Sequence, residues 1–497
     1  MAQGSKSLLV RNARVLTWDA ARTEHACADI LIENGHIAAI GPKLAAHSPY
    51  YGRVLDAEGL LAIPGLINAH LHSPGNLMRG TLDGLPLEVF MLYEVPPIAA
   101  AFDTKRISYL RTALGAIEML KLGITSVLDD AFFVPLASTT AIDAILSAYR
   151  DSGMRATVAL DQPLAVEYEK YPFLGDLLPA HIKRQMEQAP RETEAGMRAL
   201  YSHLISNWHG VAGGRLSAAV SCSAPQRAPE SYLQTLSQLS LEHDLPYFCH
   251  ILETRVQRVL GREKYSRSLV QYAHDLGILD ERMQVIHAIW IDDADIALLA
   301  RSGCTVAHNP VCNLRLGSGI MPFRKLRDAG IPICIGTDEA ASDDSHNVWG
   351  AAKMTGLIHT LADADYHHWP NATEVLDCVW RGGARAMGRR ADVGVLAAGA
   401  VADIALLDLS ADAFSPLNDV PRQLVYSETG ASVRHTVVAG ELVVEGGRAT
   451  TLDEAALKAE LRSLQPILQK QNAALKISAA KLEPYYREMY LKCARMQ

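Results

Sequence analysis

The feature of this sequence that most constrains its fold is an alternation of short apolar runs with long amphipathic stretches between residues 61 and 338. The stretches between the runs have the apolar spacing of helices, which indicates strands separated by helices. Eight strands in this arrangement fit an α/β fold, a (β/α)8 TIM-type barrel whose catalytic groups lie at the carboxyl ends of the strands. The expected strands are residues 61–68, 124–129, 156–161, 216–221, 247–252, 284–288, 305–308 and 331–336.

The two ends of the chain have the pattern of antiparallel strands instead. Residues 8–18 and 29–40 read as strands, and Asn34-Gly35 inside the second is a two-residue hairpin signal. Strand patterns return at residues 402–407 and 433–444. We therefore expect a small β-sandwich domain from residues 1–60 and 389–450, a barrel of residues 61–388, and a C-terminal helical segment of residues 451–497.

The composition of the chain excludes some classes of binding partner. The net charge is only -8 and no run of five basic residues occurs, which argues against nucleic acid. The 8 cysteines are scattered without a C-x-x-C pair, as in a reducing compartment, and no apolar run reaches the ~18 residues of a membrane span. We expect a cytoplasmic homo-oligomer that acts on a small molecule and binds neither nucleic acid nor membrane.

A cluster of candidate metal ligands falls at the expected strand ends. His70 and His72 are two residues apart on the first strand, so both imidazoles point to the same face. His250 ends the fifth strand, His287 ends the sixth and Asp338 follows the eighth, all at the catalytic rim of a barrel. This order predicts a metal site formed by His70, His72, His250 and Asp338.

The donor types restrict the metal and the chemistry. Three neutral imidazoles and one carboxylate suit Zn²⁺ or Fe²⁺ better than Mg²⁺ or Ca²⁺, which prefer oxygen ligands. We expect one divalent ion per chain, with Zn first and Fe as the alternative. Such an ion lowers the pKa of bound water from 15.7 to roughly 7, so the expected reaction is a hydrolysis by metal-bound hydroxide.

Several further residues have two interpretations each. Glu253, three residues after His250, is either a proton shuttle for the leaving group or a surface glutamate at the start of a helix. His287 either hydrogen-bonds the developing charge or packs in the core. His308, at the end of the seventh strand, is either structural or a neighbour of the metal ligands, since four protein ligands already suffice. Gln226 either reads a ring nitrogen or carbonyl or faces solvent.

The strings Pro64-Gly65-Leu66-Ile67-Asn68-Ala69-His70-Leu71-His72, His308-Asn309-Pro310 and Gly336-Thr337-Asp338 resemble motifs of the amidohydrolase superfamily. The resemblance spans nearly the whole chain. It is closest to the branch that contains methylthioadenosine/S-adenosylhomocysteine deaminase, guanine and 8-oxoguanine deaminases, and s-triazine hydrolases such as atrazine chlorohydrolase. In the same way, residues 399–404 resemble the strand by which the C-terminal segment of the family rejoins the N-terminal sandwich.

The resemblance implies a mononuclear centre with the four ligands above. It also implies that Glu253 is the proton shuttle, that His287 is a catalytic hydrogen-bonding group, and that Asp338 is both a ligand and a base toward the metal-bound water. Binuclear relatives commonly bridge two metals with a modified lysine after strand four, and residues 221–226 contain none.

Two departures from the family pattern concern the substrate. Nucleoside deaminases of this branch tend to carry an acid after the proline that closes the loop following strand one, and residues 96–100 contain none. Free bases are therefore expected to be better substrates than nucleosides. Glu339 replaces the usual glycine after the strand-eight aspartate, so we expect Glu339 and Gln226 to contact substrate.

The sequence thus predicts an aminohydrolase that deaminates a small N-heteroaromatic ring of purine, pterin, pyrimidine or triazine type. An alternative is a chlorohydrolase that removes chloride or an amine from a triazine-like ring. A remote alternative is a non-catalytic barrel scaffold, but scaffolds of this kind usually lose metal ligands and this chain retains all four. Apolar residues in the long segment 73–102 are expected either to cover a planar ligand or to pack that segment onto the barrel.

Overall fold

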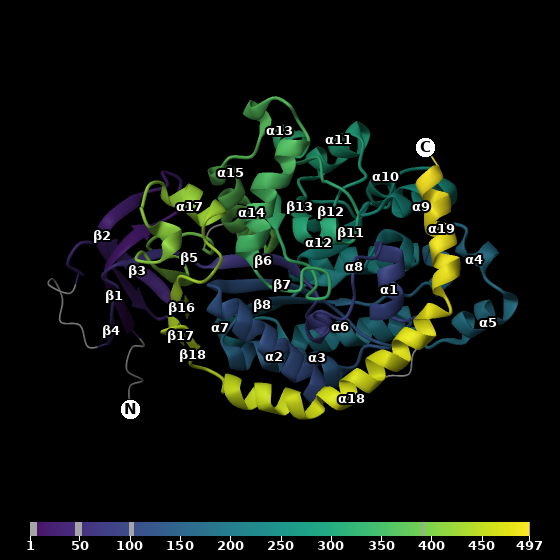
Figure 1. Ribbon diagram of the computed structural model, residues 1–497, viewed down its shortest axis with the longest axis horizontal. Coiled ribbons are helices and arrows are strands. Elements are labelled where there is room, and N and C mark those ends of the chain that lie inside the picture. Colours follow the sequence, from purple (N-terminus) through teal and green to yellow (C-terminus); the bar gives the residue numbers. More distant parts are fainter. Residues whose placement is uncertain (1–6, 45–51, 99–103, 390–391, 497) are drawn as a thin grey trace.

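All eight expected strand regions are present in the computed structural model, which describes residues 7–44, 52–98, 104–389 and 392–496 (Figure 1). Apart from the start of the first region, they lie in two parallel sheets, one of order β6-β7-β8-β9 and one of order β10-β11-β12-β13-β14. The expected fourth strand, residues 216–221, is wrong as a single element, because it is divided at Ala219 between these two sheets. The strands are β6 Leu66–Leu71, β7 Ile124–Phe132, β8 Arg155–Asp161, β9 Leu216–Ala218, β10 Val220–Ser221, β11 Tyr247–Ile251, β12 Met283–His287, β13 Thr305–His308 and β14 Ile333–Ile335.

Backbone contacts connect the two parallel sheets at both margins. Between β9 and β10, the Ala219 N–H donates to the Val158 carbonyl at 2.8 Å. At the other margin, Leu71 and Asp338 form a parallel bridge, and the Asp338 N–H donates to the His70 carbonyl at 3.0 Å. The end of β6 is therefore fixed beside the chain that leaves β14, which brings the first and last expected metal ligands together.

The first expected strand, residues 61–68, is wrong as a single element. It is two strands: β5 Leu60–Pro64 pairs in the sheet of the chain ends, and β6 begins at Leu66. Proline has no N–H to continue a ladder. At Gly65, a Cβ would lie 2.2 Å from the Thr125 side chain, so only glycine allows the chain to cross from one sheet to the other. The apolar run alone did not reveal this break.

Strands from both chain ends form one mixed sheet of order β18-β17-β16-β15-β5-β1-β2-β3, with β4 paired to β1. The Asn34-Gly35 hairpin is confirmed, because both residues have positive φ, 52° and 83°, as a type I′ turn requires. The strands are β1 Ser7–Leu16, β2 Glu24–Glu33, β3 His36–Gly41, β4 Arg53–Asp56, β15 Ile404–Asp408, β16 Val433–Val438, β17 Glu441–Glu445 and β18 Arg448–Ala449.

Helices follow the parallel strands and bury apolar side chains against them. The larger ones are α2 Lys105–Lys121, α3 Thr139–Ser152, α6 Glu194–Trp208, α8 Glu230–His243, α9 Arg255–Tyr265, α11 Asp293–Ser302 and α14 Val348–Ile358. Side-chain caps fix several of their starts; Thr254, for example, accepts from the Gln257 N–H at the start of α9. Because Glu253 directly precedes this cap, the start of α9 also fixes the backbone of that residue.

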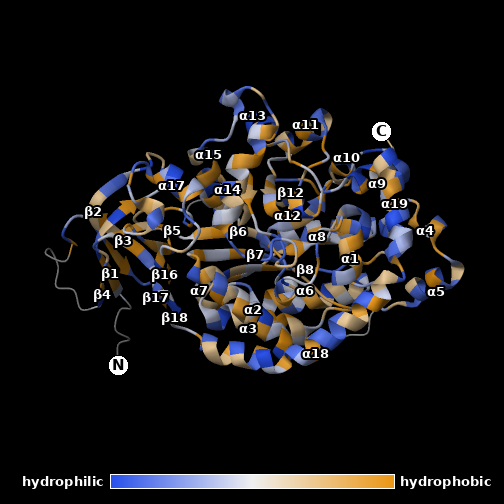
Figure 2. Cartoon of the chain, viewed as in Figure 1, coloured by the Kyte–Doolittle hydropathy of each residue, from blue (hydrophilic) through white to orange (hydrophobic). Residues whose placement is uncertain are grey.

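The expected C-terminal helical segment is two helices, α18 Glu454–Ala480 and α19 Glu483–Arg495. Figure 1 shows α18 running past α2 and α3, and α19 lying near α1 (Leu87–Glu94), α4 (Leu174–Leu177) and α9. Blue and orange segments alternate along α18 in Figure 2, as in a helix with one covered face. The C-terminal segment therefore packs on its own chain; the expected homo-oligomer stays a prediction.

Among the described helices, none combines the length and apolar content needed to cross a lipid bilayer. All 8 cysteines are free thiols, and seven of them are buried.

Candidate metal centre

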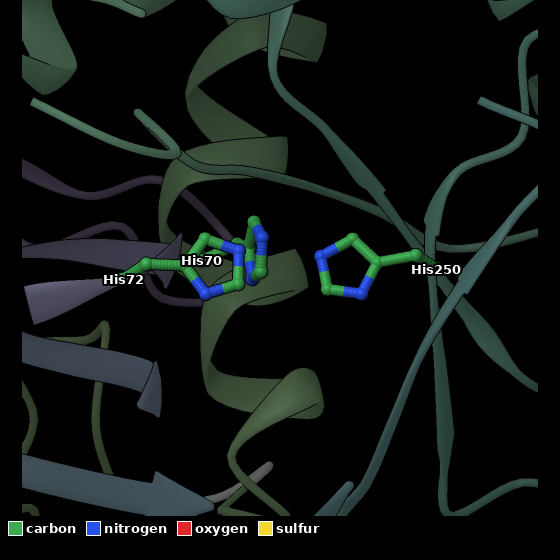
Figure 3. A group of neighbouring side chains, drawn as sticks. All are labelled: His70, His72 and His250. Carbon is green, nitrogen blue, oxygen red and sulfur yellow. The ribbon is translucent and has the colours of Figure 1, made fainter. Parts of the chain in front are cut away.

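Three histidine rings converge from two strands. His70 on β6 and His72 just after it face His250, which lies on β11 (Figure 3). Their candidate ligand nitrogens all lie within 4.8 Å of one another. The Asp338 Oδ1 atom lies 3.6 Å from the Nε2 atoms of both His70 and His72. The structure therefore brings together all four residues that the sequence predicted as metal ligands.

Hydrogen bonds orient two of the rings. The Nδ1–H of His250 donates to the Ser223 carbonyl at 2.7 Å, and the Nδ1–H of His72 donates to the Asp130 carbonyl. In each ring Nε2 is then the nitrogen that keeps a free lone pair. Backbone carbonyls that receive the outer N–H of a ligating histidine are a regular part of metal sites.

The donor set fits a divalent transition metal. His70 is fully buried, and neither of its ring nitrogens has a hydrogen-bond partner among the described residues. Burial and the neighbouring His72 and His250 rings hold the pKa of His70 well below its usual range, so the ring is neutral. Buried polar atoms without partners are rare and costly, and a cation would satisfy the lone pair. Three imidazole nitrogens with one carboxylate are ligands typical of zinc.

Glu253 and His287 adjoin these ligands. The His287 Nε2 atom lies 3.5 Å from Glu253 Oε2 and 3.7 Å from Asp338 Oδ2. The His287 Nδ1–H donates to Asn313 Oδ1 at 2.9 Å, and the Ser318 hydroxyl donates to Glu253 Oε1 at 3.4 Å. Two side chains outside the predicted set therefore orient the groups that were predicted to move protons.

Burial sets the protonation of both groups. It raises the pKa of Glu253 to about 8, and the Asp338 carboxylate acts in the same direction. Burial lowers the pKa of His287, against the opposing effect of Asp338. At neutral pH the structure therefore favours a protonated Glu253 beside a neutral imidazole, which is the state a proton donor needs.

Strained backbone marks the strand ends where these residues lie. Ser223, Leu252, His287, Ala288 and Asp338 are non-glycine residues with φ of 64°, 53°, 75°, 47° and 63°. L-residues seldom adopt this left-handed region, and such strain tends to cluster at functional sites. The turn at Leu252 immediately precedes Glu253, so local backbone geometry contributes to placing that carboxyl beside His287.

The centre opens into a cavity of about 540 Å³. One part of its wall holds His72, His250, Glu253, His287 and Asp338. Much of the remaining wall is apolar or aromatic and includes Leu87, Phe90, Met91, Phe132, Phe133 and Ile98. The segment of residues 73–102 therefore does contribute to the cavity wall, through some of its apolar residues; Ala99 and Ala100, which the sequence argument about nucleosides used, lie outside the described residues.

The two expected substrate contacts differ in position. Glu339 lines the cavity, and burial together with Glu94 raises its pKa well above the usual range. Gln226 is buried but does not line the cavity; the neighbouring Arg227 does. The chain after β10 turns as a short 3-10 helix, Pro225–Arg227, in which adjacent side chains point in different directions.

Other residues were missed or left open by the sequence. Asp130, near the end of β7, accepts from His72, and Asn313, in the short helix Pro310–Arg315 that follows β13, accepts from His287. His308 is resolved in favour of a structural role: its Nε2 lies 3.1 Å from His359 Nε2, and it is in none of the candidate metal-binding groups of the described residues.

Residues 61–443 match the family described as "Amidohydrolase family". A 5-methylthioadenosine/S-adenosylhomocysteine deaminase of Nitratidesulfovibrio vulgaris is 32% identical over 461 residues, covering 92% of this chain and 97% of the relative. A 5'-deoxyadenosine deaminase of Methanosarcina mazei is 29% identical over 447 residues, covering 90% and 95%.

Two solved structures have a similar fold. An adenosine deaminase of Xanthomonas campestris with bound zinc has a TM-score of 0.82 and 25% identity, covering 94% of this chain and 99% of that one. Atrazine chlorohydrolase of Arthrobacter aurescens TC1, complexed with zinc, has a TM-score of 0.83 and 26% identity, covering 92% and 99%.

Proposed function

Because the chain belongs to the amidohydrolase family and is a hydrolase of carbon–nitrogen bonds other than peptide bonds, we propose that it deaminates a small N-heteroaromatic ring. The observation that carries this proposal is the convergence of three histidines and Asp338 beside Glu253, at one wall of a largely apolar cavity. The reaction consumes water: a C–O bond forms at the ring carbon, the C–N bond breaks, and ammonia leaves.

We propose that His70, His72, His250 and Asp338 hold one divalent ion, Zn first and Fe as the alternative. The unpartnered nitrogens of His70 support this assignment, and the zinc-bound structures similar to this chain support the choice of metal. When bound, such an ion supplies Lewis acidity that brings the pKa of a coordinated water toward 7. The segment 221–226 has no lysine to bridge a second ion, which supports a mononuclear centre.

Three side chains then manage the protons. Asp338 Oδ2, which faces His287, accepts a proton from the attacking water. Glu253, protonated at neutral pH, donates to the ring or to the departing nitrogen. His287, with Nδ1–H committed to Asn313, directs Nε2 toward the same space and positions the reacting oxygen. Placing these groups in a buried site removes the cost of reorganising water around them.

The cavity supports a flat ring as the substrate. Phe90, Phe132 and Phe133 line it, and aromatic faces pack well against planar heterocycles. Pro97 and Ile98 also line it and offer no acid for ribose hydroxyls. Free bases are therefore proposed to be better substrates than nucleosides, although the relatives named above are deaminases of adenosine-type compounds.

We also propose that the two parallel sheets form one closed (β/α)8 barrel within residues 61–388, and that residues 1–60 and 389–450 form a β-sandwich. Support comes from the contacts at both sheet margins and from the pairing of β5 with β1 and β15. The C-terminal segment of residues 451–497 is proposed as a separate helical element. We propose that the protein is located in the cytoplasm.

Hydrolytic dechlorination or amine release from a triazine-like ring is a second candidate. The observation that favours it is the similarity to atrazine chlorohydrolase reported above. The same attacking water and the same donor, Glu253, would serve a different leaving group.

The test is to assay the zinc-loaded protein against free purines, pterins, pyrimidines, aminotriazines, chlorotriazines and adenosine-type nucleosides, with ammonia and chloride both measured. We expect ammonia from at least one free heterocycle, with the highest kcat/KM in that group. A preference of about tenfold or more for a nucleoside over every free ring would contradict the proposed substrate class. Chloride release without ammonia would establish the second candidate, and neither product would refute both.

A further inference from the structure

Arg227 is a buried cation on the cavity wall that forms no ion pair with any described residue. It lies at the end of the short helix Pro225–Arg227, after β10, and its side chain lines the same cavity as His250 and Glu253. One guanidinium nitrogen donates to the Ser223 hydroxyl at 2.9 Å. Among the described residues, no carboxylate oxygen lies within 4.0 Å of the guanidinium nitrogens.

The acids that interact with Arg227 through space are Asp161, Glu167, Glu253 and Glu88. Each lies beyond ion-pair distance from it. Glu167 is already paired with Lys170 at 2.7 Å and accepts from the Tyr486 hydroxyl at 3.0 Å. Glu253 accepts from Ser318 and faces His287, and because burial raises its pKa to about 8 it offers no anion at neutral pH. The surrounding acids therefore offset part of the desolvation cost of the Arg227 charge at long range. Within the described part of the chain, they leave its remaining guanidinium N–H groups without an anion as hydrogen-bond partner.

The other deeply buried arginine shows the contrast. Arg155 is 2% exposed and forms two hydrogen bonds to the carboxylate of Asp403, at 2.9 and 3.3 Å. Arg227 is 9% exposed and has no such partner, but it borders a cavity. Burying an unpaired charge costs free energy. The structural Arg155 has a protein counterion, whereas Arg227 lies where a bound ligand can supply one.

We infer that Arg227 binds a carboxylate on the substrate, so that the ring deaminated at this site is an N-heteroaromatic acid. This inference rests on the proposed function and specifies its substrate class. A guanidinium matches a carboxylate through two parallel, charge-assisted N–H bonds, and the carboxylate also supplies a negative charge that the edge of a neutral ring does not. Ser223 connects the two ends of the site, because its hydroxyl accepts from Arg227 and its carbonyl accepts from His250.

The experiment compares matched rings that differ only in the acid: pterin with pterin-6-carboxylate, and a methylamino-triazine with its carboxymethylamino counterpart. A third arm uses rings with an ionised ring oxygen and no carboxylate. For the zinc-loaded protein we expect kcat/KM for ammonia release to be at least about tenfold higher for the carboxylated member of each pair. A ratio of one or below, or an equal preference for the ring oxyanions, would overturn the inference.

Arg227→Met tests the residue itself, because methionine fills much of the space without the charge. We expect the carboxylate preference to fall by roughly 10- to 100-fold. Arg227→Lys should retain part of it. Lys170→Met is the matched control: it also removes a cavity-lining cation, but one already paired with Glu167, so the preference should persist. An unchanged preference in Arg227→Met would overturn the inference.

Two measurements of melting temperature separate this inference from a structural role and from failure of the proposed function. Without ligand, Arg227→Met should change the melting temperature only slightly, since it removes one hydrogen bond to Ser223 together with a buried charge that has no ion-pair partner. Carboxylated rings should raise the melting temperature of the unsubstituted protein and not that of Arg227→Met, whether or not ammonia forms. A large fall in melting temperature without ligand, or an equal ligand-induced rise in both proteins, would contradict the assignment.

Discussion

Replacing Glu253 by Gln removes a transferable proton and little else. The amide is nearly the same size, and its oxygen can still accept the 3.4 Å hydrogen bond from Ser318. The carboxyl is 3% exposed and lies 3.5 Å from His287, so water cannot easily replace it as a donor. General acid–base catalysis by a positioned group contributes about 10²–10⁴ in rate. We therefore expect kcat to fall by that factor, equivalent to ~3–5 kcal/mol in the barrier.

The assay is steady-state ammonia release on the best free heterocycle, with zinc per chain and melting temperature measured on the same samples. Ser318→Ala is the graded control, because it removes the hydrogen bond to Glu253 and keeps the carboxyl; its kcat should fall by less than about tenfold. Full kcat in Glu253→Gln at equal zinc content would refute the role of Glu253. His287, as the other group facing Asp338, would then be the candidate.

Three further predictions concern the fold around the site. Arg155→Met leaves Asp403 buried without its partner and should lower the free energy of unfolding in urea by about 3–5 kcal/mol; no loss would contradict the paired-charge argument. Gly336→Ala places a Cβ 2.7 Å from His70 N, so we expect about 1–3 kcal/mol of destabilisation and less zinc per chain; full zinc occupancy would refute it. Burial raises the pKa of Glu88 from 4.5 to about 7, so its contribution to stability is present below 4.5 and is lost as the pH rises through 7. Between pH 5 and 8, the free energy of unfolding of the unsubstituted protein should therefore fall by up to about 3 kcal/mol more than that of Glu88→Gln. The same pH dependence in both proteins would contradict this.

Sequence periodicity located the parallel strands because each is a buried apolar run ending in polar residues. The four predicted metal ligands lie together because ends of neighbouring parallel strands share one edge. The same reasoning failed at Pro64 and Gly65, where one apolar run serves two sheets. Hydrophobicity does not distinguish a strand that continues from one that changes its partners.

The cavity wall was less accessible to sequence reasoning. Gln226 was expected to contact substrate, but the adjacent Arg227 lines the cavity instead. Which of two neighbouring side chains in a tight turn faces the cavity depends on backbone angles, and residue type does not reveal it. Asn313 lies 26 positions after His287 and follows a different strand, so their hydrogen bond is a consequence of the tertiary fold. Asp338 has a left-handed φ of 63° and forms a bridge to Leu71 of β6, and neither feature follows from its neighbours in the sequence.

The central claim is that His70, His72, His250 and Asp338 hold one metal ion that the reaction requires. The most direct test is metal content per chain after exhaustive dialysis, by elemental analysis, together with activity after chelation and after return of Zn²⁺ or Fe²⁺. We predict one ion per chain, loss of activity on its removal, and recovery when it is restored, with no ion retained by His70→Ala. Two ions per chain, or activity that survives complete removal of metal, would contradict the claim.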